Sequence, residues 1–322
     1  MTSYSHAFDW ARRHVDAGTL PGAVLGVATS EGVVALDAFG DAETGDHYPL
    51  FSITKPLVGL AALRLVEQGR LTLETPLTDA VPEFGADRAD VVRLRHLVSH
   101  TAGIPEPALD VPGGLRPALL APGRDFAAGA ISRYSTIAYE GIAALIAHAG
   151  GAPWEQQVLE TLAAADATGV TFDVASTRHA PIECAEQGVD WELFASHRNP
   201  GAGAFARAED LLAVAVSLLR DDGRLVHPLT GAMMRRSLTD DVPTIDPYPP
   251  ERGTHWGFTW CLRDAAPAAL ARDAFGHGGW AGTDFWLHPE HDVAFVLLTN
   301  VASSGRLGLS LDELDNAVVT AR

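Results

Sequence analysis

Lysine is almost absent from this sequence. The 23 basic residues among 322 include one lysine, Lys55, and all the others are arginine. Basic residues are scarce as a class too, because 41 acidic residues outnumber them and give a formal net charge of −18. A field of that sign repels the phosphate backbone, so we expect no nucleic-acid partner. The acidic residues are spread along the chain, which is typical of a solvated acidic surface.

Cysteine and long apolar runs are also scarce. Two cysteines, Cys184 and Cys261, make no disulfide framework; they could pair, but free buried thiols are the expectation. The apolar run "AVLGVA" is far too short to cross a bilayer, and the N-terminus lacks the basic and apolar segments of an export signal. We therefore expect a cytoplasmic protein with no membrane partner, although a leader removed upstream would leave the same sequence.

Strand signals occur at both ends of the chain, and helical signals lie between them. Residues 22–29 and 32–40 predict a hairpin with a turn at Ser30-Glu31-Gly32. Short aromatic or β-branched segments predict the closing strands: 255–262, 271–279, 283–290 and 292–300. Apolar residues at helical spacing predict helices in the middle: 91–100, 138–150, 153–163 and 207–221.

This order of elements predicts an α/β fold of the α+β kind. Residues 1–75 and 255–322 would form one domain, an antiparallel sheet built from both chain ends and flanked by helices. The first helix and a last helix, 307–321, would pack on that sheet. Residues 76–254 would form a mostly helical inserted domain, and the active site would lie in the cleft between the two domains.

The lone lysine stands three residues after a serine, in the stretch "SITK". Residues 53–68 predict a helix that ends at Gly69, so Ser52 would lie at its N-terminus with Lys55 on the same side. A serine hydroxyl becomes a nucleophile when a neighbouring base takes its proton. Buried lysine can act as that base, whereas arginine keeps its proton. The alternative is a capping serine and a surface lysine, but a surface lysine would be expected to have drifted to arginine like the others.

Three motifs together resemble a known family. "SITK" at 52–55 resembles the first motif of the class C β-lactamase-like serine hydrolases, which include serine β-lactamases, D-alanyl-D-alanine carboxypeptidases, family VIII esterases and some acyltransferases. Tyr134-Ser135-Thr136 stands where that family has Tyr-x-Asn, and "HGG" at 277–279 resembles its Lys-Thr-Gly or His-x-Gly motif. The segments 94–105, 201–219 and 276–300 match its landmarks in order, so the resemblance covers nearly the whole chain.

The resemblance implies that Ser52, Lys55 and Tyr134 are the catalytic residues. Read alone, Tyr134 would more often be a half-buried structural tyrosine. A phenol has a reference pKa of about 10, so it needs a neighbouring positive charge to act as a base near neutral pH. Protonated Lys55 would supply that charge, and the two groups would titrate as a coupled pair. The family's oxyanion hole maps to the backbone N–H groups of Ser52 and Trp280.

The second and third motifs bear on the substrate. His277, Gly278 and Gly279 would lie on an edge strand facing the cleft, where glycine permits close backbone approach. Histidine in place of the family's lysine removes a permanent positive charge, so a substrate carboxylate becomes a weaker requirement. Thr136 replaces the family's asparagine and offers only a hydroxyl, which argues against recognition of amide-bearing β-lactams. Both departures favour neutral esters.

We therefore predict a serine hydrolase that forms an acyl-enzyme on Ser52 and acts on small carboxylic esters. Three alternatives remain open: an acyltransferase using the same acyl-enzyme, a D-amino-acid peptidase or β-lactamase, and a catalytically silent binding homologue. No cofactor or metal is expected, because "HPEHD" at 288–292 is typical of a polar turn and "GAGAFA" at 201–206 follows no strand. The partner would be a small-molecule ester or amide, and the sequence leaves the oligomeric state open.

Overall fold

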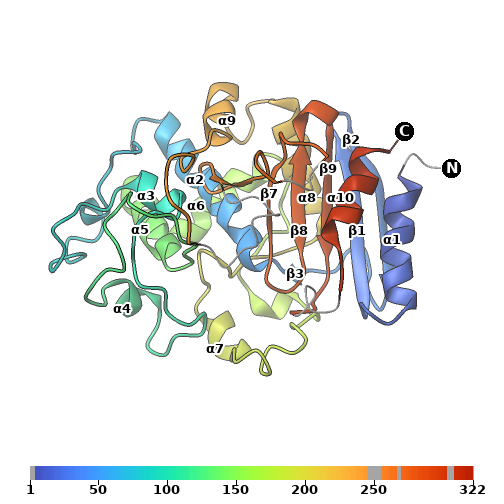
Figure 1. Cartoon of the computed structure of the whole chain (residues 1–322), viewed down its shortest axis with the longest axis horizontal. Helices are drawn as coiled ribbons and strands as arrows, with labels where there is room; N and C mark the ends of the chain where they lie inside the picture. The colour runs from blue at the N-terminus through green and yellow to red at the C-terminus, as the bar shows by residue number, and fades with distance from the viewer. Residues whose placement is uncertain (1–3, 246–254, 267–269, 303–307, 322) are drawn as a thin grey trace.

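The computed structural model describes residues 4–245, 255–266, 270–302 and 308–321. Within them, strands from both ends of the chain form one antiparallel sheet in the order β2-β1-β9-β8-β7-β6-β5 (Figure 1). These strands are β1 (Gly22–Thr29), β2 (Gly32–Gly40), β5 (His255–Trp256), β6 (Cys261–Leu262), β7 (Phe275–Gly278), β8 (Asp284–His288) and β9 (Val293–Leu298). The two chain ends join where β1 pairs with β9. This confirms the predicted sheet.

The N-terminal hairpin of β1 and β2 has the bounds that the sequence predicts. At the other end, residues 255–262 were expected as one strand, and this expectation is wrong. They form β5 and β6, which pair with each other across a turn. Thr259 in that turn has a φ of 68°, so the chain reverses there instead of continuing extended. The sheet thereby gains two short strands beyond β7.

Helices cover both faces of the sheet. α1 (Ser5–Asp16) and α10 (Leu311–Val319) pack together on one face, and α8 (Ala208–Arg220) packs on the other (Figure 1). The side chains of β1 alternate accordingly, because Leu25 and Val27 pack with the α1 and α10 cluster while Val24 packs with the cluster that contains α8. Gly26 allows α8 to approach closely, since a Cβ there would lie 2.6 Å from Leu212. The first and last helices therefore flank the sheet as predicted.

A mostly helical region lies beside the sheet. α2 (Thr54–Glu67), α5 (Ala138–Gly150) and α6 (Trp154–Ala163) pack on one another, and α3 (Leu94–Val98) packs on α5. Shorter described elements are α4 (Leu115–Leu119), α7 (Trp191–Ser196), α9 (Pro228–Met234), β3 (Tyr48–Pro49), β4 (Phe205–Ala206) and 3₁₀ turns at 51–53, 77–79, 174–176 and 289–291. α3 is shorter than the predicted 91–100, because Arg93 is extended, with φ −120° and ψ 164°, and the chain leaves the helix at Ser99, after which His100 has a φ of 60°.

Two helices pack across the domain boundaries that the sequence suggests. α2 belongs to residues 1–75 but packs on α5 and α6, whereas α8 belongs to residues 76–254 but packs on the sheet. Residue 254 lies outside the described residues, as does the first residue of the expected helix 307–321, which is observed from Leu311. The division into two domains stays a prediction.

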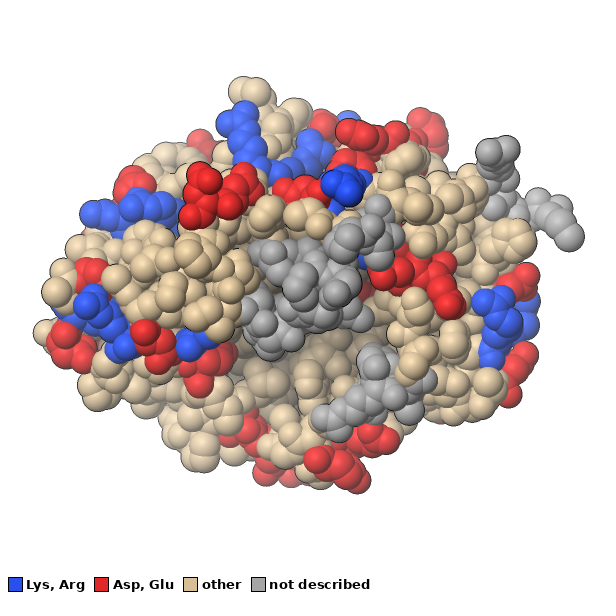
Figure 2. All heavy atoms as spheres, viewed as in Figure 1, with Lys and Arg blue, Asp and Glu red and all other residues tan. Residues whose placement is uncertain are grey.

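The structure can be compared with three expectations from the sequence, which concern the cysteines, membrane-spanning helices and the surface charge. Cys184 and Cys261 are both buried, and they form no disulfide with each other. None of the described helices is long and apolar enough to cross a membrane. On the face in Figure 2, acidic side chains lie in several separate groups, some beside basic side chains and some, along the lower edge, without them. This distribution is what a solvated acidic surface predicts.

Candidate active site

The turn before α2 presents Ser52. A 3₁₀ turn, Phe51–Ile53, runs directly into the helix, and Ser52 is 8% exposed. Phe51 has a φ of 44°, a left-handed conformation that costs about 1–3 kcal/mol in a residue other than glycine. Its ring stacks on the ring of Phe194, with the ring centroids 5.1 Å apart, and its centroid lies 5.2 Å from that of the Trp280 ring. Aromatic packing therefore holds the strained turn that places Ser52 at the start of α2.

Lys55 is fully buried, so the alternative of a surface lysine is wrong. Its Nζ donates to Ser52 Oγ at 3.1 Å, to Thr136 Oγ1 at 3.2 Å and to the carbonyl oxygen of Gly201 at 2.8 Å. All three acceptors are neutral oxygens. Burial lowers the pKa of Lys55 to about 7, against the opposing negative charge of Glu106. Near neutral pH this amine can therefore exist with or without its extra proton.

Tyr134 meets Ser52 from the other side of the site. Its hydroxyl donates to Ser52 Oγ at 2.6 Å, and Lys55 Nζ lies 4.6 Å from the centre of its ring. Ser52 Oγ thus receives hydrogen bonds from two groups that can both lose a proton. Once either group is deprotonated, it becomes an acceptor within reach of the serine proton. The structure brings together the three residues that the sequence singles out.

The third motif lies against the backbone next to the nucleophile. A Cβ on Gly279 would lie within 2.4 Å of the carbonyl oxygen of Leu50, so glycine is needed for this close approach. Thr283 Oγ1 donates to the same carbonyl at 3.3 Å. This packing sets Trp280 beside Phe51, next to Ser52. The oxyanion role of the two backbone N–H groups stays a prediction.

His277 is buried and lies on β7, but β7 is not an edge strand as expected. It lies between β8 and β6, because the short β5–β6 hairpin extends the sheet. β6 pairs only with Phe275 and Gly276, so His277 and Gly278 pair with β8 alone. Burial, reinforced by the positive charge of Lys55, lowers the pKa of His277 to about 3. The imidazole is therefore neutral at pH 7.

Two contact residues of Lys55 and Thr136 escaped the sequence reasoning. The carbonyl oxygen of Gly201 accepts a hydrogen bond from Lys55, and the N–H of Gly201 donates to Asn199 Oδ1 at 2.8 Å. Glu106 accepts the N–H of Thr136 at 2.8 Å. Gly201 stands in "GAGAFA", a sequence that resembles a dinucleotide motif and a family landmark but gives no sign of a contact with lysine. Glu106 follows the landmark 94–105 directly, so position was its one signal.

Comparison with known proteins identifies the family to which the chain belongs. A family model described as Beta-lactamase matches residues 8–320. The chain belongs to the Beta-lactamase family. Esterase EstB from Burkholderia gladioli is 26% identical to this family member, over 84% of this chain and 81% of EstB.

Two solved structures share the fold of this Beta-lactamase family member. EstCE1, a hydrolase with promiscuous acyltransferase activity, has a TM-score of 0.79 at 21% identity and covers 99% of this chain and 98% of its own. Simvastatin synthase (LovD) from Aspergillus terreus has a TM-score of 0.78 at 18% identity, with the same coverage of 99% and 98%. The family and the fold that the sequence predicts are both confirmed.

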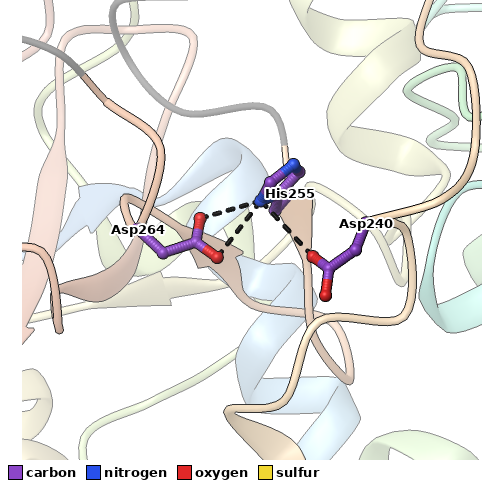
Figure 3. Close-up of side chains that lie close together, drawn as sticks. All are labelled: Asp240, His255 and Asp264. Atoms are coloured by element: carbon purple, nitrogen blue, oxygen red, sulfur yellow. Dashed lines mark hydrogen bonds and ion pairs between the residues drawn. The ribbon is translucent and has the colours of Figure 1, made fainter.

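One group of described side chains in this Beta-lactamase family member has metal-ligand chemistry: Asp240, His255 and Asp264 (Figure 3). His255 Nδ1 lies 2.9 and 3.1 Å from the carboxylate oxygens of Asp264 and 3.5 Å from Asp240 Oδ1. The side chains of Asp240 and Asp264 are 60% and 44% exposed. A histidine that is hydrogen-bonded to one carboxylate and ion-paired with another accounts for this geometry. The expectation of no metal site stays a prediction.

Proposed function

We propose that this chain is a serine hydrolase that forms an acyl-enzyme on Ser52 and acts on small carboxylic esters. The observation that carries the proposal is the contact of one serine oxygen with both Lys55 Nζ, at 3.1 Å, and the Tyr134 hydroxyl, at 2.6 Å. Membership of the Beta-lactamase family and the likeness to esterase EstB support it. The same contacts count against a silent binding protein, which has no need of a buried lysine with a lowered pKa.

The reaction follows from these contacts. The coupled pair of Lys55 and Tyr134 takes the proton of Ser52 while Oγ attacks the ester carbonyl carbon. The backbone N–H groups of Ser52 and Trp280 stabilise the oxyanion of the tetrahedral intermediate. The bond between the carbonyl carbon and the leaving alkoxy oxygen then breaks. The Lys55 and Tyr134 pair returns the proton to that oxygen, and the acyl group remains on Ser52 Oγ. Attack by water repeats these steps and releases the carboxylic acid.

The residues around the base favour an ester over a β-lactam. Thr136 directs its hydroxyl to Lys55 and has no amide group to offer a substrate. His277 is neutral at pH 7, so it supplies no positive charge for a substrate carboxylate. Transfer of the acyl group to an alcohol or amine acceptor is the second candidate, because EstCE1 and LovD, which share the fold, are described as catalysts of acyl transfer or synthesis. Those likenesses are below 25% identity and give the fold alone.

The test begins with covalent trapping. Incubation with a fluorophosphonate should add one adduct to the wild type and none to Ser52→Ala, as measured by intact mass. Ser176→Ala, a change in an exposed 3₁₀ turn, is the matched control and should label like the wild type. An adduct that persists in Ser52→Ala would overturn the assignment of the nucleophile.

The substrate class needs a second assay. p-Nitrophenyl esters of short acids should turn over much faster than nitrocefin. Comparable efficiency on nitrocefin would contradict the weight given to Thr136 and His277. Added alcohols or amines distinguish transfer from hydrolysis, because a transferase would convert most of the acyl group to the new ester or amide.

A further inference from the structure

Glu106 binds the backbone of the second motif. Its Oε1 accepts the N–H of Thr136 at 2.8 Å and that of Ile137 at 3.2 Å, and its Oε2 lies 3.4 Å from the same N–H of Ile137. These residues directly precede α5, which begins at Ala138, so their N–H groups have no partner within the helix. The carboxylate therefore fixes the segment that carries Tyr134 and Thr136.

The same carboxylate acts on Lys55. Thr136 links them, because its N–H binds Glu106 while its hydroxyl accepts from Lys55 Nζ at 3.2 Å. Among the described residues, no carboxylate forms an ion pair with Lys55 within 4.0 Å. A carboxylate in direct contact would hold the lysine proton and replace Ser52 as its partner. Thr136 lies between Glu106 and Lys55, so the charge of Glu106 can act on Lys55 while the lysine keeps its contact with Ser52.

The effect is reciprocal. The negative charge of Glu106 raises the pKa of Lys55, against the larger effect of burial, which lowers it. Loss of solvent on its protein-facing side raises the pKa of Glu106, while its hydrogen bonds with Ser135 and Thr136 and the charge of Lys55 lower it. The side chain nevertheless reaches solvent, so screening limits the strength of this coupling.

Other titratable side chains around Lys55 include Tyr134, Tyr139, His100 and His277. Tyr134 and Tyr139 face the amine with their rings, at 4.6 and 5.3 Å. Burial keeps the pKa of Tyr139 well above its ordinary value. Burial and the charge of Lys55 lower the pKa values of His100 and His277, so both imidazoles are neutral. The charge whose effect on Lys55 is resolved is therefore the negative charge of Glu106, which raises the pKa of the lysine.

We propose that Glu106 is a positioning residue that fixes Thr136 for its contact with Lys55 and whose charge favours the protonated form of that lysine. The proposal rests on the function proposed above but can be measured apart from it. Because Lys55 is the only lysine, ¹³C labelling of lysine Cε gives a single side-chain signal from this chain. Its titration reports the protonation of Lys55 in the folded protein, whether or not the protein is active.

The decisive variant is Glu106→Gln, which keeps an oxygen acceptor for the two N–H groups but removes the charge. Removing a negative charge disfavours protonated lysine, so the titration midpoint should fall by about one pH unit, the low end of the range for a close opposite charge. The limb of the pH–rate profile for aryl-ester acylation that belongs to Lys55 should move to lower pH by the same amount. This sign holds whether the limb rises or falls.

Two further variants separate charge from structure. Glu31→Gln removes the same charge in the exposed β1–β2 turn and should leave the midpoint unchanged. Glu106→Asp keeps the charge and should restore most of the wild-type midpoint. If Glu106→Gln does not fold by circular dichroism, Glu106→Ala gives the same titration.

The outcomes are distinct. An unchanged lysine midpoint in a folded Glu106→Gln or Glu106→Ala variant would overturn the inference, as would an equal shift in Glu31→Gln. A fluorophosphonate adduct that survives Ser52→Ala would overturn the proposed function instead. Neither result depends on the other.

Discussion

Two buried basic side chains in this molecule have opposite kinds of partners. Lys55, at the start of α2, contacts three neutral oxygens. Arg263, beneath α10, pairs with two carboxylates, at 2.5 Å from Asp312 and 3.1 Å from Asp315. Both are withdrawn from water, since Lys55 is fully buried and the side chain of Arg263 is 5% exposed. The difference lies in what surrounds the charge.

The comparison separates a structural cation from a reactive one. Removing a charge from water is costly unless a partner compensates it. The two carboxylates compensate the charge of Arg263, which also lies 5.2 Å from the ring of Trp286. Lys55 has hydrogen bonds but no ion pair with a described residue, and burial lowers its pKa to about 7. A buried cation without a carboxylate in contact is one that can exchange its proton.

The same comparison explains the first histidine of "HPEHD", His288. The segment forms a turn between β8 and β9, as the sequence predicts. His288 is nevertheless fully buried, with Nε2 at 3.1 Å from Asp315 Oδ1. It therefore belongs to the cluster with Arg263 that joins the sheet to α10. Its place is structural, on the face covered by α1 and α10.

The largest effect that tests this comparison is expected from Lys55→Arg. Arginine keeps its proton, so acylation of Ser52 should fall by roughly 10²–10⁴-fold, the usual loss when a general base is removed. Burst kinetics with an aryl ester measures acylation, and circular dichroism with thermal melting checks the fold. Lys55→Ala serves if the larger guanidinium does not fit. Arg64→Lys, the reverse change on the same helix, is the control and should acylate like the wild type.

Near-wild-type acylation by a folded Lys55→Arg variant would contradict the reactive role of the lysine. The lone lysine would then reflect codon history, and the contrast with Arg263 would have no chemical meaning.

The reverse pattern is expected at the other cation. Arg263→Ala removes the arginine partner of the buried Asp315 and of the partly exposed Asp312, so the free energy of unfolding should fall by roughly 3 kcal/mol. Acylation per folded molecule should stay within about twofold of wild type, since Arg263 pairs with Asp312 and Asp315 and lies over the ring of Trp286, whereas Ser52 contacts Lys55 and Tyr134. Arg263→Lys, which keeps the charge but loses the forked geometry, should lose less, about 1 kcal/mol. Urea unfolding measures both. A loss of acylation comparable to that of Lys55→Arg would break the comparison.

Long periodic segments were predictable from the sequence. The β1–β2 hairpin and α5 have the predicted bounds, and α8 lies within one residue of its prediction at each end. Their patterns extend over enough residues for one face to be identified. The two-residue strands β3, β4, β5 and β6 carry no such pattern. They form because tertiary contacts bring their backbones together, which a local pattern does not record.

The site divides in the same way. Ser52, Lys55 and Tyr134 would act through side chains of distinctive chemistry, so their residue types and their order in the chain were enough to predict them. Gly201 acts through a backbone carbonyl, which every residue has, and lies 146 residues from Lys55. Glu106 binds two backbone N–H groups about thirty residues further along the chain, at Thr136 and Ile137, separations of 30 and 31. Contacts of that kind become visible only once the chain is folded.

The smallest effect concerns stability and follows from the pKa of Lys55. In the unfolded chain a lysine has a pKa of about 10.4, and burial lowers it to about 7 in the folded protein. Between these values the unfolded state binds more protons than the folded one, so stability rises with pH. The stabilising contribution is complete above the unfolded pKa and is lost as pH falls through about 7. Lys55→Met removes this titration, so the unfolding free energy of the wild type relative to Lys55→Met should increase from pH 7 to pH 9, by at most about 1.4 kcal/mol per pH unit. Urea unfolding of both proteins at several pH values measures the difference, in which the titrations common to both cancel. A difference that stays constant across this range would show that Lys55 remains charged when buried, and the contrast with Arg263 would then fail.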